Sequence, residues 1–409
     1  MASFADYDMP LWYPTGVKAE HLAVIQGAGV FDTSHMAVVT VKGRGAREVL
    51  QHCLSKDLDR CIGPNHMPLV SGRCVYGIFL NPDGTVTDDA IVYQLESEQY
   101  MVVVNAGMGA EIAKHLVESG REEIVVEDLT DRVGKMDIQG PESGAILGKI
   151  IKDPDGLFDG LTYFSFKGGF GNCSLPVPVE LMDGTEVLVS RTGYTGEFGF
   201  ELFVEIDRLN FLWNQLLESG EKYGVLPCGL AARDSLRAGA VLPLSHQDIG
   251  PWPFVLNPWQ FALPWNDDGI SFSKDFIGAD ALLEETEAGH TVPFAGFDPR
   301  KIAASDTTFV VDSTGENIGR ILTCTTDMAI GRKDGEIVGI TPGSDKGDIE
   351  GFIPKGLCCG FLLLNKGFEA GDIVYLSDGK RKLKVEIRSD IRPGRSARRS
   401  IKMLIKQEE

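Results

Sequence analysis

The chain has 409 residues, with 39 Lys or Arg against 59 Asp or Glu and a formal net charge of −20. Such an acidic protein is not expected to bind nucleic acid or an anionic membrane through broad electrostatic attraction. The sequence holds no apolar run of about 18 residues, and its first residues lack the basic and apolar regions of a signal peptide, so we expect a cytoplasmic protein of two or three domains.

The spacing of cysteines and histidines gives no sign of a metal site. The eight cysteines are scattered without a C-x-x-C pair, and the seven histidines form no H-E-x-x-H pattern. Neither a G-x-G-x-x-G fingerprint nor a phosphate-binding P-loop motif is present. The sequence therefore predicts reduced structural thiols, no bound metal and no nucleotide-driven chemistry.

Helices and strands alternate in the first part of the chain. Apolar residues at helical spacing predict helices over 17–26 and 46–54, and an alternating pattern predicts a strand over 38–42. A strand over 75–80, the turn sequence Asn-Pro-Asp-Gly and a returning strand over 87–93 then predict a hairpin.

The returning strand carries two neighbouring carboxylates. Side chains alternate along a strand, so Asp88 and Asp89 should point to opposite faces and are poor partners for an acid–base dyad. One of them should face solvent or a loop. The other should share the half-buried face of Ile91 and Tyr93, where a carboxylate needs a partner. Asp89 is therefore a candidate functional residue, although an aspartate at a strand entry is more often a turn or edge residue.

Two further stretches in the middle of the chain hold polar residues next to predicted strands. A strand over 100–105 closes with Asn105, which we interpret as a cap for a helix over 108–117. A strand over 136–138, a short helix around 145–147 and a loop or irregular hairpin over 164–183 precede the segment 190–204. If this segment is extended from Glu197 onward, Glu197, Gly199 and Glu201 share one face, and the glycines let a flat ligand approach the backbone.

A helix over 209–219 precedes a second helix that carries Arg233 and Arg237. These residues share one helix face and could receive a carboxylate ligand as a fork of donors, although a solvated pair is the more common arrangement. The segment 251–265 holds four prolines and three tryptophans and predicts no regular element; folded over a cleft, it would form an aromatic wall. Residues 272–283 predict a final helix before a domain boundary near 284–289.

Short strands with turns dominate from residue 292 onward and predict a small all-β barrel or sandwich. The predicted strands are 308–311, 318–323, 360–364, 373–376 and 383–387. The polar, glycine-rich stretch 331–351 predicts a surface loop. Residues 378–409 hold eleven Lys or Arg and five Asp or Glu, a balance of +6, and this basic tail is a candidate docking surface for an anionic partner.

Seven stretches stand in an order that resembles the aminomethyltransferase family, the T-protein of the glycine cleavage system. They are FDTSHM (31–36), LNPDGTVTDDAIVY (80–93), VVNA (103–106), QGPES (139–143), RTGYTGEFGFE (191–201), GLAARDSLRAGAVLPL (229–244) and KDFIGADAL (274–282). The resemblance covers most of residues 9–283, and the following β region looks, more weakly, like that family's C-terminal barrel domain.

This resemblance implies an α+β, T-protein-like folate-binding fold over 1–284, with two interleaved subdomains and a C-terminal all-β barrel domain over 290–409. The subdomains would combine 1–46 with 132–245 and 47–131 with 246–284. The implied activity is a tetrahydrofolate-dependent transfer of the aminomethyl carbon from the lipoyl arm of a carrier protein, the H-protein, to tetrahydrofolate, with release of ammonia.

The resemblance also implies roles for individual residues. Asp89 would be the catalytic carboxylate near the folate nitrogens, and Glu201 would bind the pterin, whose N–H donors suit a carboxylate. Tyr194 would flank the folate, and Arg233 would bind farther along, toward its acidic end. The other positions that match the family close to the cofactor are Asn105 and Met36.

Two other functions remain open at this point. A folate-dependent demethylase would take a methyl group from a sulfonium or methoxy-aromatic donor, on which Trp252, Trp259 and Trp265 could stack. A non-enzymatic folate-binding maturation or regulatory protein is the second alternative, although the K-G-C-Y motif of those relatives reads R-T-G-Y here.

The basic tail suggests where a carrier would dock. If the tail binds an acidic lipoyl carrier, charge reversal at Arg395, Arg398 and Arg399 should weaken carrier-dependent turnover and flatten its dependence on salt.

Overall fold

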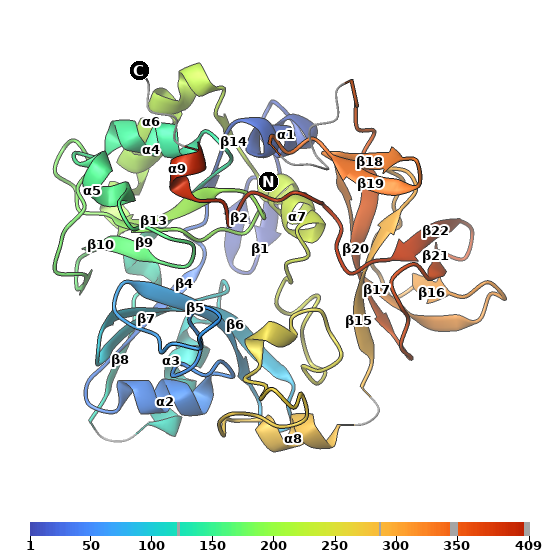
Figure 1. Ribbon diagram of the computed structural model, residues 1–409, viewed down its shortest axis with the longest axis horizontal. Helices are drawn as coiled ribbons and strands as arrows, with labels where there is room; N and C mark the ends of the chain where they lie inside the picture. Colours follow the sequence, from blue (N-terminus) through green and yellow to red (C-terminus); the bar gives the residue numbers. More distant parts are fainter. Residues whose placement is uncertain (121–122, 286–287, 344–350, 405–409) are drawn as a thin grey trace.

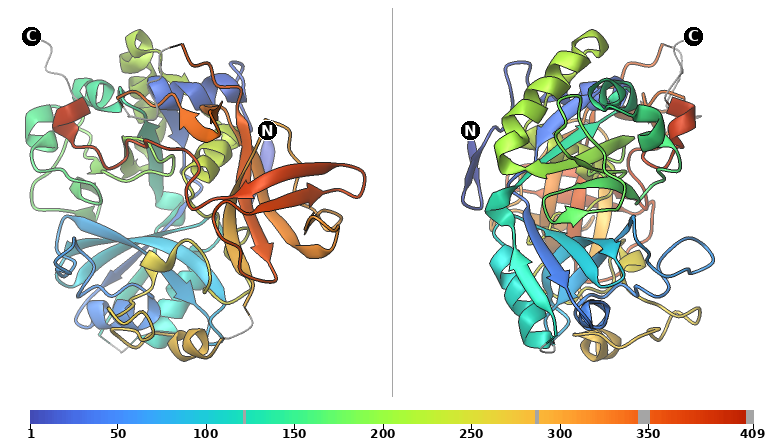
Figure 2. Two further views of the ribbon diagram at one scale, coloured as in Figure 1. Left: turned by 45° about the vertical axis from the view of Figure 1, so that its right-hand side comes forward. Right: turned by 90° about the vertical axis from the view of Figure 1, so that its left-hand side faces the viewer.

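The computed structural model describes residues 1–120, 123–285, 288–343 and 351–404. In these residues two β-sheets and a closed β-barrel are joined by helices and long connections (Figure 1). The hairpin of β1 (Ala2–Phe4) and β2 (Tyr7–Met9) stands at one edge of the molecule, as the right-hand view of Figure 2 shows. None of the described helices is long and apolar enough to cross a bilayer.

The first sheet has five antiparallel strands. They are β4 Ala37–Lys42, β5 Arg73–Leu80, β6 Val86–Glu96, β7 Gln99–Val104 and β8 Val125–Asp128, in the order β5-β6-β7-β4-β8. Helices α2 (Ala46–Cys53) and α3 (Gly109–Ser119) cover one face, where Val39 and Val102 pack against them. The alternate residues Val38 and Val103 point the other way and pack against the second sheet.

The second sheet has seven strands. They are β3 Gly29–Asp32, β9 Val133–Gln139, β10 Phe166–Phe170, β11 Cys173–Ser174, β12 Leu188–Ser190, β13 Gly199–Glu205 and β14 Leu226–Pro227. Their order is β11-β10-β12-β13-β9-β3-β14, and β14 runs parallel to β3. The helices of this region are α1 Val17–Gln26, α4 Ser143–Ile150, α5 Pro154–Phe158, α6 Leu209–Gly220 and α7 Leu230–Gly239. The predicted irregular hairpin over 164–183 is confirmed by the β10–β11 pair.

The C-terminal β region forms a closed barrel in the order β15-β20-β17-β16-β21-β22. Its strands are β15 His290–Gly296, β16 Phe309–Val311, β17 Asn317–Asp327, β20 Leu357–Leu364, β21 Ile373–Ser377 and β22 Lys382–Ile387. Closure through β15 and β22 confirms the predicted barrel. Figure 2 places this barrel beside the two sheets.

Two predicted elements were wrong. Residues 331–351 were expected to be a loop, yet β18 (Ile330–Lys333) and β19 (Glu336–Gly339) form a hairpin whose Ile337 and Val338 are buried; residues 344–350 lie outside the described residues. The expected helix over 272–283 is limited to α8 (Ala279–Glu284). Its cap, Gly278, has φ 85°, and a Cβ there would lie 2.7 Å from the Asn81 carbonyl oxygen, so the helix cannot extend back through this residue.

The basic tail crosses back over the molecule. It leaves the barrel and runs to α9 (Ile401–Leu404), as the red trace in Figure 1 shows. Ile401 and Leu404 pack into the core of the seven-stranded sheet, and Arg392 is fully buried. The described part of the tail is therefore built into the fold. The proposed boundaries of the two interleaved subdomains stay a prediction.

The remaining described elements are short 3-10 helices. They are η1 Thr130–Arg132, η2 Ile206–Arg208, η3 Glu221–Tyr223 and η4 Gln260–Ala262.

Candidate functional site

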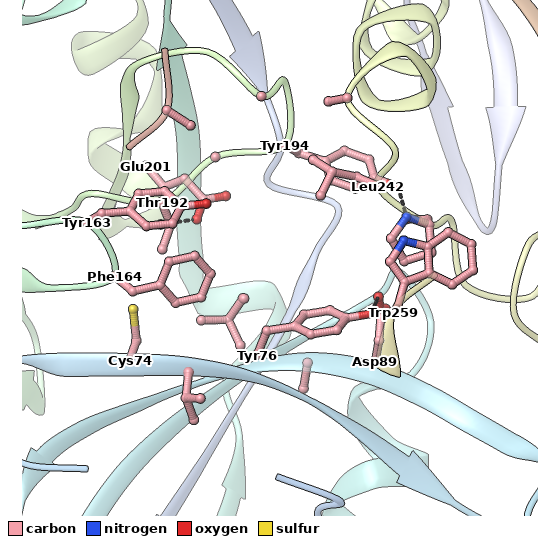
Figure 3. Close-up of a pocket in the computed structure, with 18 of the residues that line it drawn as sticks. Cys74, Tyr76, Asp89, Tyr163, Phe164, Thr192, Tyr194, Glu201, Leu242 and Trp259 are labelled. Atoms are coloured by element: carbon pink, nitrogen blue, oxygen red, sulfur yellow. Dashed lines mark hydrogen bonds between the residues drawn. The ribbon is translucent and has the colours of Figure 1, made fainter. Parts of the chain in front are cut away.

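A cavity of about 1100 Å³ lies between the two sheets, the segment after α7 and the C-terminal tail. Figure 3 shows Glu201 and Thr192 at one side of this space and Asp89, Tyr76 and Trp259 at the other. The predicted residues Met36, Asn105, Tyr194 and Arg233 also line it. The cavity thus brings together all six site residues that the sequence suggested.

Asp89 lies on β6 at the floor of the cavity, half-buried. Its Oδ2 accepts a hydrogen bond of 2.8 Å from the Tyr76 hydroxyl on β5, and its Oδ1 accepts one of 2.6 Å from Asn105 Nδ2. Burial, and then the charge of Asp88, raises the pKa of Asp89 to about 7. This carboxyl group can therefore exchange a proton near neutral pH.

Asp88 does not face solvent, because its side chain is fully buried. It accepts hydrogen bonds from the backbone nitrogen of Asn105 at 2.9 Å and from Asn105 Nδ2 at 2.7 Å. His246, on the loop after α7, lies 3.7 Å from Asp88 Oδ1. Of the two surroundings expected for this aspartate, solvent or a loop, the structure therefore shows the loop. Burial raises the pKa of Asp88 to about 6.

The interpretation of Asn105 as a helix cap was wrong. The cap of α3 is Met108, and no side chain caps this helix. Because Ala90 pairs with Val104, Asn105 lies opposite Asp89 across the two strands, and its amide donates to both aspartates.

At the other side of the cavity, Glu201 ends a chain of buried charges. Its Oε1 accepts a 2.5 Å hydrogen bond from Lys135 Nζ, and its Oε2 accepts one from Thr192 Oγ1. Lys135 also donates to Asp137 Oδ1 at 2.6 Å, and Asp137 Oδ2 accepts from Arg233 at 2.8 Å. Two carboxylates thus alternate with two cations, which is how buried charges are tolerated.

The two arginines of α7 do not act as one fork. Arg233 donates to Asp137 and stacks 4.8 Å from the centre of the Tyr194 ring, at the cavity wall. Arg237 is buried instead, with hydrogen bonds to Asp234 and Asp248. Arg233 and Arg237 were expected either to bind one carboxylate ligand together or to form a solvated pair. Both predictions were wrong, because Arg237 is engaged in internal ion pairs.

Glu197 also departs from the expected ligand-facing arrangement. It is buried and accepts hydrogen bonds from Arg392 Nε at 3.1 Å and from Ser396 Oγ at 2.6 Å. Both glutamates line the cavity, but the Glu197 carboxylate is paired with the tail.

Comparisons with known proteins agree with this architecture. Residues 1–257 match the family model described as the GCVT N-terminal domain. The chain is 39% identical over 287 residues to an aminomethyltransferase of Streptomyces avermitilis, with 69% of each chain covered. The chain belongs to the aminomethyltransferase family. As a family member it is an enzyme of the one-carbon transferase class, so the non-enzymatic alternative is wrong.

Further relatives extend the match along this aminomethyltransferase-family chain. An aminomethyltransferase of Caldanaerobacter subterraneus is 34% identical and covers 78% of this chain and 79% of its own. The crystal structure of the glycine cleavage system aminomethyltransferase T from Bartonella henselae has a TM-score of 0.71 and 27% identity. It covers 95% of this chain and 92% of its own, so the barrel is included in the likeness.

In this family member the Trp/Pro segment contributes one tryptophan to the cavity. Trp259 is 1% exposed, lines the cavity and donates from Nε1 to the Val241 carbonyl at 2.9 Å. The Arg320 guanidinium lies over the Trp252 ring, and Trp265 packs against Phe272. Neither tryptophan lines this cavity. The three tryptophans therefore do not form the donor cage that a demethylase was expected to use.

The tail forms part of the aminomethyltransferase cavity. Its residues Arg395 and Arg398 line the space, and Arg398 lies 5.6 Å from the centre of the Tyr163 ring. Arg395 donates to Ala240 O and Asp390, and Arg399 donates to Pro342 O. Their role in docking a carrier stays a prediction.

Three described residues of the cavity wall hold a buried polar atom without a hydrogen-bond partner. Within the described residues, His35 Nδ1, Arg73 Nε and Arg191 Nε are buried without a hydrogen-bond partner, and all three residues line the cavity. Burial lowers the pKa of His35 to about 3, so its imidazole is neutral. Such a wall suits a large, flat, polar ligand. No described group of three His, Cys, Asp or Glu side chains is arranged to hold a metal ion.

Sequence reasoning missed Tyr76, Lys135 and Arg191 as site residues. Lys135 and Asp137 alternate with apolar residues on β9, so two charges on one face of a buried strand were a usable signal. Nothing in the local pattern distinguished Tyr76 from a core residue.

Proposed function

We propose that this chain is a tetrahydrofolate-dependent aminomethyltransferase. It transfers the aminomethyl carbon from the lipoyl arm of a carrier protein to tetrahydrofolate and releases ammonia. The observation that carries this proposal is the Asp89 carboxylate in the cavity wall, fixed by Tyr76 and Asn105 and able to titrate near pH 7. Family membership supplies the reaction class.

The residues present fit tetrahydrofolate. Glu201 and Thr192 offer oxygen atoms to the N–H groups of a pterin, and Tyr194 and Met36 offer flanking surface. Arg233 uses one of its five N–H donors on Asp137, which leaves donors for the acidic end of the ligand.

When bound, tetrahydrofolate supplies the nitrogen nucleophiles that receive the one-carbon unit. Asp89 accepts a proton from an attacking amine or orients it, and its negative charge stabilises positive charge that develops at the transferred carbon. Tyr76 and Asn105 hold the two carboxylate oxygens, so Asp89 needs no reorganisation during the reaction. A ligand that fills the cavity displaces its water, which strengthens these interactions.

A single-turnover experiment with a panel of donors tests the proposal. The protein is mixed with tetrahydrofolate and either an aminomethyl-lipoyl carrier or, separately, sulfonium and methoxy-aromatic methyl donors. We expect ammonia and methylenetetrahydrofolate from the carrier and no reaction from the methyl donors. Methyltetrahydrofolate from a methyl donor, with no product from the carrier, would show a demethylase instead.

The proposed pterin contact has its own test. Glu201→Gln keeps the shape but weakens the acceptor, so we expect tetrahydrofolate to bind roughly 10- to 100-fold more weakly in calorimetry. Glu205→Gln, at the exposed end of the same strand, is the matched control and should bind like the wild type. Equal affinity of the two variants for tetrahydrofolate would show that the pterin does not bind at Glu201.

A further inference from the structure

Asp88 is the buried carboxylate that the proposed reaction does not use. It is fully buried on β6, one residue before Asp89, and polar groups of Asn105, Ser245 and His246 lie around it. The backbone nitrogen and Nδ2 of Asn105 donate to its two oxygens, and His246 Nε2 lies 3.7 Å away. A buried carboxylate with this many partners is an arranged feature of the fold.

One side-chain amide joins the two aspartates. Asn105 Nδ2 lies 2.7 Å from Asp88 Oδ1 and 2.6 Å from Asp89 Oδ1. An amide nitrogen carries two hydrogens, so each carboxylate receives one of them. The backbone hydrogen bond from Asn105 to Asp88 fixes the residue that bears the amide, and hence the direction in which the amide meets Asp89.

We propose that Asp88 is a positioning residue for Asp89 and acts through the Asn105 side chain. Asp88 anchors the amide, the amide fixes one oxygen of Asp89, and Tyr76 fixes the other. The inference rests on the proposed function of Asp89 as the transfer carboxylate. It assigns a task to the first aspartate of the pair.

The arrangement also sets the charge state of Asp89. Asp89 is faced by Tyr76 from β5, by Asn105 after β7, by Asp88 on its own strand, and by Tyr194 across the cavity. Asp88 is faced by Asn105 and His246. The charge of Asp88 favours the protonated form of Asp89, whereas the Asn105 hydrogen bond favours its ionised form. Removing the charge of Asp88 should therefore lower the pKa of Asp89, and removing the Asn105 hydrogen bond should raise it.

The test follows the pH profile of single-turnover transfer in three variants. Asp88→Asn removes the neighbouring charge, so the acidic midpoint should fall by about one pH unit. Asn105→Ser removes the shared donor, so the midpoint should rise. Asp83→Asn, in the exposed turn of the same hairpin, is the control and should keep the wild-type midpoint.

A second readout covers variants that transfer too slowly. The carboxyl carbon of Asp89 is titrated by NMR in protein labelled with carbon-13 aspartate, and the Asp89→Asn spectrum identifies its signal. Shifts of the Asp89 midpoint in Asp88→Asn and Asn105→Ser that are not additive in the double variant support the inference, and additive shifts overturn it, because the charge of Asp88 would then act without Asn105. If the wild type transfers nothing from the carrier, the proposed function fails, and the NMR titration still decides the inference.

Discussion

Asp89 occupies a place where ionisation is unfavourable. Its carboxyl group is half-buried, beside the buried carboxyl of Asp88, and two hydrogen bonds offset only part of that penalty. Because the pKa of Asp89 is raised from 3.8 to about 7, the folded protein holds a proton that the unfolded chain loses. Stability should then fall as the pH rises between these two values.

We predict that Asp89→Asn stabilises the protein at alkaline pH. The amide resembles the neutral carboxyl group, so the variant lacks the free-energy cost of the buried negative charge that Asp89 carries above pH 7. The gain should be on the order of 2–4 kcal/mol at pH 8 and should vanish near pH 3.5, where both forms are neutral. Denaturant unfolding at the two pH values measures it. A wild type that is the more stable protein at pH 8 would contradict this account.

At the residue scale, the roles of the site residues came from the family resemblance, because the local pattern left each residue more than one interpretation. Asp89, Glu201 and Tyr194 line one cavity, and their roles there stay a prediction. Asn105 was found for the wrong reason, because a cap depends on the next helix and its true partners lie on a neighbouring strand. Lys135, the partner of Glu201, lies 66 positions earlier in the sequence, and a local pattern cannot predict a contact between residues so far apart along the chain.

Arg191 is one of the buried residues that hold the C-terminal tail. The Arg191 guanidinium lies 4.2 Å from the ring centre of Phe198 and 5.4 Å from that of Phe200. It donates to the tail carbonyl oxygens of Ala397 at 3.0 Å and Arg399 at 3.2 Å. Since a neighbouring part of the tail lines the cavity, Arg191 fixes one wall of the site.

We predict that Arg191→Lys loosens the tail. A lysine keeps the charge but cannot donate to both carbonyl groups in the fork geometry of a guanidinium or stack as a plane on the rings. Amide hydrogen exchange over residues 395–404 should rise about tenfold or more, because each lost hydrogen bond contributes about 1 kcal/mol. Arg208→Lys, which alters the more exposed pair with Asp183, is the control. Unchanged exchange in the tail would refute this anchoring role.

Elements were predictable where the local pattern decides them. Five predicted barrel strands and helices α1, α2 and α6 agree with the structure, whereas the first barrel strand, β15, was not predicted. The hairpin at 330–339 was missed because its polar, glycine-rich sequence lacks a strand pattern, and it is stabilised by burial of Ile337 and Val338. The short α8 begins after Gly278, whose left-handed backbone conformation and close approach to Asn81 require a glycine.

At the scale of the whole molecule, a buried ionic cluster joins the barrel to the rest. Asp327, on β17 of the barrel, accepts hydrogen bonds from His21 Nε2 at 3.0 Å and from Arg392 Nη1 at 2.6 Å. Arg392 also binds Glu197, and His21 Nδ1 meets Ser235 Oγ at 2.7 Å. Helices α1 and α7, the barrel and the tail thus meet at one carboxylate.

We predict that Asp327→Asn destabilises the protein by about 3–5 kcal/mol at neutral pH, because it leaves the buried Arg392 with one carboxylate fewer. Burial alone would raise the pKa of Asp327, but Arg392 and His21 outweigh it and hold the pKa well below its usual range. The stabilisation is therefore present above pH 4 and is lost as the pH falls below it. Thermal unfolding at pH 7 measures the effect.

The matched control for this substitution is Asp306→Asn, an exposed aspartate of the same barrel. It should leave the thermal midpoint within the error of the wild type. An equal loss in both variants would mean that the cluster contributes no more than an ordinary surface carboxylate.

The overall architecture was only partly predictable from the sequence. The barrel and the mixed α/β region followed from the change in pattern near residue 290 and from the family resemblance. The path of the tail did not follow, because its basic composition favoured a solvated or docking surface. Arg392 instead pairs with Glu197 and Asp327, far away along the chain, and such pairings depend on the complete fold.

The measurement that tests the central claim most directly is ammonia release in a single turnover with an aminomethyl-lipoyl carrier and tetrahydrofolate. Wild type and Asp89→Asn are compared, with tetrahydrofolate affinity measured in parallel. We predict a rate roughly a hundredfold or more lower in Asp89→Asn, with affinity little changed. A variant that binds tetrahydrofolate and releases ammonia at the wild-type rate would show that the reaction does not depend on this carboxylate.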